Sequence, residues 1–229
     1  NIPHALFEGQ QKHMVPSCEL SQQIVRALSR VSRIRLEPPC QPVPRPLIEA
    51  VVRLSTLFTR GQGFEGEPYL EDTMLRTAYL AYFLPVNFAK VQVLLDETAA
   101  VIRRPIGTPF HVLDVGGGPG TGTLAFLDWV SARSHGEAPA VESTVIDHSS
   151  EALRLCAELW HAYRSGQPVV GLQQLRTLEC NFEKKLPREL HAASDLPAYD
   201  LILVQNVLTE LSCGQSESTE KRAVLVETL

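Results

Sequence analysis

The sequence has few of the features that mark secreted, metal-rich, membrane-spanning or strongly basic proteins. Its cysteines are far apart and none forms a C-x-x-C pair, so neither a disulfide framework nor a zinc knuckle is indicated and we expect reduced intracellular thiols. No apolar run approaches the roughly 20 residues of a membrane span, and we expect no membrane partner. The formal net charge is −5, so any contact with RNA needs a local basic patch. The cysteines are Cys18, Cys40, Cys156, Cys180 and Cys213.

The composition is globular, with 44% hydrophobic and 21% charged residues among 229, which is core enough for one large or two small domains. The pattern divides into an all-helical segment over residues 1–104 and an α/β part over 105–229. Helices are expected over 19–35, 46–60 and 69–84, and Pro85 is expected to restart the chain as a further helix to about residue 103. The predicted buried side of that last helix is Val86, Ala89, Val93 and Val101.

The first of these helices carries the most basic stretch of the chain. Its arginines are either a solvated helix face or a contact with RNA phosphates. They are Arg26, Arg30, Arg33 and Arg35.

A strand, a glycine loop and a helix follow one another in His111–Thr123, HVLDVGGGPGTGT. The apolar run around Val112 predicts a buried strand, and a helix is expected from Thr121. Glycines between them let the backbone approach a ligand, and the helix N-terminus offers free N–H groups. Spaced as D-x-G-x-G-x-G, the segment resembles motif I of class I methyltransferases, which bind S-adenosylmethionine (SAM). The candidate cofactor residues in this segment are Asp114, Gly116, Gly117, Gly118 and Gly120.

Two other interpretations of the loop remain open. Gly120, Gly122 and Ala125 satisfy the dinucleotide pattern G-x-G-x-x-A, but that match begins five residues beyond the strand instead of at its end. The loop could also serve packing alone, without a ligand. The position of the glycines favours SAM over both.

Polar side chains follow the other predicted strands, where ligands bind in open parallel sheets. The strand Val141–Ile146 ends in Asp147 and His148, and Asp147 is expected to accept hydrogen bonds from the cofactor's ribose or else to cap the next helix. After the expected strand at 175–178, Asn181 faces the adenine or lies in a plain loop.

A fourth strand is expected at Leu201–Val204, with Gln205 and Asn206 after it. Both are candidate catalytic residues that would position a methyl acceptor, and Gln205 is also a candidate cofactor contact; the alternative is that they cap a loop. Methyl transfer from a sulfonium needs alignment more than acid–base chemistry, so no catalytic triad is required.

Four segments together resemble the methyltransferase-like small-ribosomal-subunit proteins, which are mitochondrial ribosomal assembly factors and their bacterial relatives. The segments are Thr77–Glu97, His111–Thr123, Val145–Leu153 and Leu201–Leu211. The resemblance covers about residues 47–229. It implies a Rossmann-like SAM domain behind helices, and as partner the small ribosomal subunit, both rRNA and ribosomal proteins. The compartment it implies is the mitochondrial matrix in a eukaryote or the cytoplasm in a bacterium.

The family also implies an iron–sulfur or zinc site, which is expected C-terminal to Leu229. The Rossmann-like domain is expected to be incomplete at its C-terminal end, because no strand is predicted after the fourth. We predict no metal site within these 229 residues, and the oligomeric state is left open. Three functions remain: a SAM-dependent methyltransferase of rRNA or ribosomal protein, a non-catalytic SAM-binding assembly factor, and an NAD(P)-dependent oxidoreductase.

Overall fold

The computed structural model describes seven stretches of the chain, residues 20–36, 42–59, 69–102, 108–133, 140–165, 173–181 and 199–206. The helices are α1 (Gln22–Ser32), α2 (Arg45–Thr59), α3 (Thr73–Ala78), the π-helical turn η1 (Tyr79–Phe83), α4 (Leu84–Thr98), α5 (Thr121–Arg133) and α6 (Ser150–Arg164). The strands are β1 (Phe110–Val115), β2 (Val141–Asp147), β3 (Gln173–Glu179) and β4 (Leu201–Val204). The sequence also predicts the start of a helix over 217–229, and these residues lie outside the described part of the chain.

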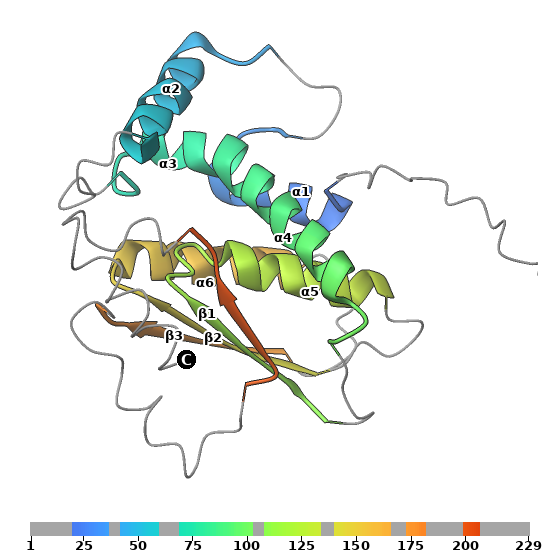
Figure 1. Cartoon of the computed structure of the whole chain (residues 1–229). Helices are drawn as coiled ribbons and strands as arrows, with labels where there is room; N and C mark the ends of the chain where they lie inside the picture. Colours follow the sequence, from blue (N-terminus) through green and yellow to red (C-terminus); the bar gives the residue numbers. More distant parts are fainter. Residues whose placement is uncertain are drawn as a thin grey trace, which may run out of the picture.

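The strands form a parallel sheet in the order β3-β2-β1-β4, and α5 and α6 lie on the same face of it (Figure 1). β1 and β2 pair with a strand on each side, and their apolar runs suit strands that are covered on both faces. The order places β1, which feeds the glycine loop, next to both β2 and β4. The prediction of a Rossmann-like α/β fold preceded by helices is confirmed.

α1 and α4 share one hydrophobic core with the sheet, whereas the buried residues of α2 and α3 form a separate cluster. α1 packs on α6 and α4 packs on α5, so that Ile24, Phe88 and Phe126 belong to the same buried cluster. The sequence places Leu20, Ile24, Leu28 and Val31 on one apolar face of the first helix, and Ile24 and Leu28 are fully buried in the structure. The predicted boundary between residues 104 and 105 lies outside the described residues and stays a prediction.

A buried carboxylate joins four of these elements. Asp128 in α5 accepts hydrogen bonds from the hydroxyl of Ser21, which caps α1, from Gln92 Nε2 in α4 at 2.9 Å and from the Tyr163 hydroxyl in α6 at 3.0 Å. Burial raises the pKa of Tyr163, which keeps its phenol protonated as a donor. The helical segment is thus tied to the α/β part by polar as well as apolar contacts.

The prediction that Pro85 separates two helices is wrong. Residues 73–98 form one continuous helical run, in which the N–H of Leu84 donates to the carbonyl of Tyr79, five residues earlier. This π-helical turn stands directly before Pro85, which has no N–H to donate, so the helix continues without a break.

The predicted buried side of α4 is also wrong. Leu84, Phe88, Val91 and Leu95 are buried, whereas Val86 is 42% and Val101 77% exposed. Leu84, Phe88 and Leu95 are larger than valine, so this face of the helix buries more apolar area. Val101 lies beyond the helix end at Thr98, so it does not share the helical face.

By length and mean hydropathy alone, the run Thr73–Thr98 could cross a membrane, although it contains no unbroken apolar stretch of that length. In this fold one face of the run instead enters the core, where Phe88 is fully buried. On the same helix, Gln92 donates to the buried Asp128. Packing on α5 therefore accounts for the buried apolar face of this helix, while Met74, Val86 and Leu94 stay exposed in the described part of the structure.

Candidate functional site

The carboxyl ends of the four strands lie side by side at one edge of the sheet. Val115 at the end of β1 is in register with Ile146 of β2 and with Val204 of β4, and Asp147 is in register with Glu179 of β3. The candidate residues predicted from the sequence follow these strand ends directly and lie along this edge. They are Gly116, His148, Asn181, Gln205 and Asn206.

The glycine loop turns tightly from β1 into α5. Gly116, Gly118 and Gly120 have φ of 61°, 52° and 78°, a region that residues with side chains rarely adopt. The loop is held by the N–H of Gly117, which donates to the Ile146 carbonyl at 3.1 Å, and by the N–H of Gly120, which donates to the Gly117 carbonyl at 2.8 Å. The glycines at positions 116, 118 and 120 are therefore required by the backbone conformation of the loop.

The glycines differ in what surrounds them. A Cβ on Gly117 would stand 2.7 Å from Asp114 Cγ, and one on Gly120 would stand 2.5 Å from Cys156 Sγ. Among the described residues, a Cβ on Gly118 would have only Asp147 Oδ2 within 4 Å, at 3.9 Å. Gly117 and Gly120 are thus required by packing inside the protein, whereas the described part of the chain leaves space beside Gly118 that a ligand could enter.

Asp114 lies buried beneath the loop, 1% exposed. Its Oδ2 accepts hydrogen bonds from the N–H and the hydroxyl of Thr123, both at 2.9 Å, while its Oδ1 accepts none from the described residues. Burial, with a smaller contribution from the Asp147 charge, raises the pKa of Asp114 to about 6. Asp114 therefore fixes the start of α5 and keeps one buried oxygen without a donor among these residues.

Asp147 connects the loop to α6. It is 7% exposed, its Oδ2 accepts from the N–H of Gly118 at 2.9 Å, and its Oδ1 accepts from the N–H of Ser149 at 2.8 Å. Ser149 is the residue that caps α6, through the N–H of Ala152 at 3.2 Å. The cap is therefore Ser149, and the part of Asp147 in binding ribose stays a prediction.

The two neighbouring candidates lie on the β2 and β3 side of the loop. His148 is exposed, with its Nδ1 3.5 Å from Asp147 Oδ1. The N–H of Cys180 donates to the Asp147 carbonyl at 2.9 Å and so holds the end of β3 against β2, which places the exposed Asn181 at the same edge. The geometry permits both residues to contact a cofactor there, and both assignments stay predictions.

Gln205 and Asn206 lie on the β4 side. The Nε2 of Gln205 donates to the carbonyl of Asn87 in α4 at 3.0 Å, which ties this helix to the end of β4. Asn206 is exposed and has φ of 62°, a conformation that asparagine tolerates better than most residues. The sequence alone did not indicate Asn87, because no local pattern relates a helix carbonyl to a residue 118 positions later.

The candidate site has no metal-binding cluster among the described residues. No group of three His, Cys, Asp or Glu in those residues could hold a metal ion. Cys156 is buried against Gly120, and burial raises the pKa of its thiol, which suits packing and not metal binding. Cys18, Cys40 and Cys213 lie outside the described residues, as does the VLTEL segment after Asn206.

Comparison with known proteins adds the family. A search of curated proteins found no match to this chain. A family model described as mitochondrial small ribosomal subunit Rsm22 matches residues 74–229, a range that contains all four segments on which the sequence resemblance rests. The chain belongs to this Rsm22 family, which is methyltransferase-like.

Proposed function

We propose that this protein binds SAM at the carboxyl edge of its sheet and acts as a methyltransferase on the small ribosomal subunit, on rRNA or a ribosomal protein. The observation that carries the proposal is Gly118, which borders open space while its N–H is fixed by Asp147. The family name supports the ribosomal partner. In a eukaryote the compartment would be the mitochondrial matrix.

The charges around the loop fit SAM better than a dinucleotide. SAM carries a positive sulfonium and a positive amino group, and its ribose offers hydroxyl donors. Asp114 and Asp147 place two carboxyl groups beside or beneath the loop, and Asp114 Oδ1 has no donor among the described residues. Asp147, at the end of β2, suits the ribose of either cofactor, whereas the carboxylate of Asp114 beneath the loop would repel the pyrophosphate of NAD, which other Rossmann folds place at this helix N-terminus.

In this proposal the bound cofactor supplies a methyl group to a nucleophile of the ribosomal partner. The protein's own contribution is alignment. The loop fixes the position of the cofactor, Asp147 holds the loop, and α4 beside Gln205 forms one wall of the acceptor entrance. Asn206, exposed at the end of β4, would orient the acceptor through its amide.

The cofactor assignment predicts that a side chain at position 118 blocks SAM. In Gly118→Val and Gly118→Asn we expect SAM affinity to fall at least about tenfold in calorimetry, since the new atoms enter the space toward the ligand. Asparagine tolerates a positive φ, so Gly118→Asn separates blocked binding from backbone strain. A retained unfolding transition is the control. Unchanged SAM affinity, or tighter binding of NAD than of SAM by the wild-type protein, would overturn the assignment.

The catalytic assignment is tested at Asn206. Asn206→Gly removes the amide, and glycine accepts the φ of 62° without strain. We expect transfer of labelled methyl from SAM to immature small subunits to fall about tenfold, because the acceptor loses a positioning contact, with SAM affinity changed less than about threefold. Equal transfer by variant and wild type would refute a positioning role.

A non-catalytic assembly factor is the second candidate function. It is favoured by Gln205, because one of its two amide N–H groups donates to the Asn87 carbonyl and ties the side chain to α4, which is a structural role. If the wild-type protein binds SAM but transfers no methyl to immature subunits, this second function replaces the first.

A further inference from the structure

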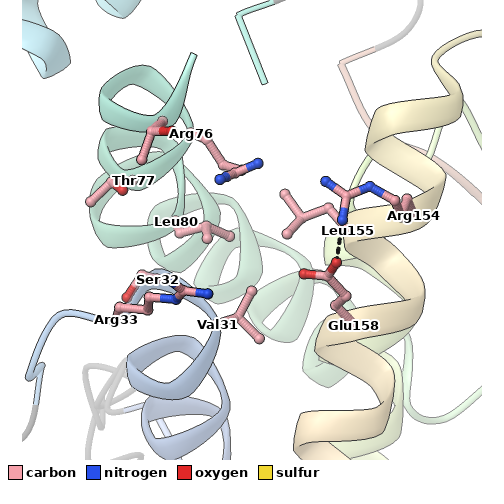
Figure 2. Close-up of a pocket in the computed structure, with 10 residues that line it drawn as sticks. Val31, Ser32, Arg33, Arg76, Thr77, Leu80, Arg154, Leu155 and Glu158 are labelled. Carbon is pink, nitrogen blue, oxygen red and sulfur yellow. Dashed lines mark hydrogen bonds and ion pairs between the residues drawn. The ribbon is translucent and has the colours of Figure 1, made fainter. Parts of the chain in front are cut away.

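A second candidate site lies away from the glycine loop, between α1, the start of the long helical run and α6. It is a cavity of about 260 Å³ whose polar wall holds Arg33, Arg76 and Arg154, and whose floor includes the buried Leu80 and Leu155. Figure 2 shows the three guanidinium groups pointing from three different helical elements toward the same space. We call these three residues the arginine pocket.

The arginine pocket carries more positive than negative charge. Arg154 is paired with Glu151 and Glu158, and Arg76 Nη1 lies 3.3 Å from Glu151 Oε1. Arg33 makes no ion pair with a described residue. Among the described residues, three arginines therefore face two carboxylates, an excess of one positive charge that a ligand could neutralise.

Its chemistry suits a phosphate group. A guanidinium presents a planar fork of N–H donors that matches phosphate oxygens in a bidentate manner, which a lysine does not. The hydroxyls of Ser32 and Thr77 also line the cavity and can add donors.

The basic surface extends from the pocket along α1. Arg26 and Arg30 are exposed at a spacing of four residues, so they share one face of α1, and the exposed Arg33 directly follows the end of this helix. α1 contains no acidic residue, in a chain whose net charge is −5. Such a row matches a ligand with several phosphates in succession better than a single small anion.

We propose that the arginine pocket and the basic face of α1 bind the phosphate backbone of RNA. The proposal rests on the proposed function for its choice of RNA, because a small ribosomal subunit presents RNA. It assigns the RNA contact to a surface separate from the cofactor loop.

The test measures the affinity of the full chain for a fluorescein-labelled, single-stranded RNA of about 20 nucleotides, by anisotropy across a series of KCl concentrations. We expect Arg33→Gln and Arg76→Gln each to weaken binding about three- to tenfold and to lower the slope of log K against log salt by about 0.7. Arg45→Gln is the charge-matched control. Arg45 is exposed on α2 and pairs with Glu49 at 2.9 Å, outside the pocket.

Several outcomes would overturn the proposal. If Arg45→Gln weakens RNA binding as much as the pocket variants do, the affinity responds to overall charge only. If poly-glutamate displaces the RNA at equal charge concentration, the ligand of the pocket is an acidic peptide instead of RNA. Arg33→Gln is not expected to change the stability of the fold, because the side chain of Arg33 is exposed. The melting temperature of Arg76→Gln has to be compared with that of the wild type, since Arg76 contacts Glu151.

Calorimetry with SAM separates this proposal from the proposed function. If the pocket variants lower the slope of log K against log salt and the wild-type protein binds no SAM, the arginine pocket is supported and the cofactor assignment is refuted. Normal SAM binding with unchanged slopes in both pocket variants would refute the pocket alone.

Discussion

Replacing Gly120 with alanine is expected to lower the free energy of unfolding by about 3 kcal/mol. A residue with a side chain at its φ of 78° costs about 1–2 kcal/mol. The new Cβ would also stand 2.5 Å from Cys156 Sγ in α6, and overpacking of this kind costs about 1–3 kcal/mol. The loss is measured by urea unfolding, as a lower midpoint at unchanged slope.

Gly118→Ala is the matched control for Gly120→Ala. It needs the same left-handed backbone, but its Cβ meets only Asp147 Oδ2 at 3.9 Å, so we expect a loss of about 1 kcal/mol. In Gly120→Ala combined with Cys156→Ala the clash is removed, and the double variant should be more stable than the sum of the two single losses indicates. Equal losses at 118 and 120, or strictly additive losses, would contradict packing against Cys156.

Features that rest on local sequence were predictable. The apolar run of β1 and the glycines of the loop each depend on a few neighbouring residues, and the structure has them where the sequence places them. The four strand ends could be assembled into one edge because parallel strands joined by helices bring their carboxyl ends together.

Features that depend on distant residues were not predictable. Nothing in the sequence relates Gly120 to Cys156, or Gln205 to Asn87, because each contact follows from how whole helices pack. The arginine pocket is assembled in the same way from three helical elements. The error at Pro85 was of another kind, since a π-helical turn supplied an alternative to the helix break that proline favours.

Asp114→Asn is expected to remove a large pH dependence of stability. Asp114 has a pKa of about 6 in the fold against an ordinary value of 3.8, so the folded state holds the proton more tightly than the unfolded state does. The protonated Asp114 therefore makes its full contribution to the free energy of unfolding below about pH 4, and this contribution is lost as the pH rises toward 6. Each pKa unit is worth about 1.4 kcal/mol, so the loss amounts to about 3 kcal/mol.

The variant cannot titrate at this position, and its side-chain oxygen can still accept from the N–H and the hydroxyl of Thr123. Wild type and variant are compared by urea unfolding between about pH 4 and pH 7, and the difference between their curves isolates Asp114. Asp72 and Glu151, whose pKa values are lowered by hydrogen bonds, act in the opposite direction and equally in both proteins. If the free energy of unfolding depends on pH in the same way in wild type and variant, the buried carboxyl does not hold its proton more tightly in the fold, and Asp114 is charged beneath the loop.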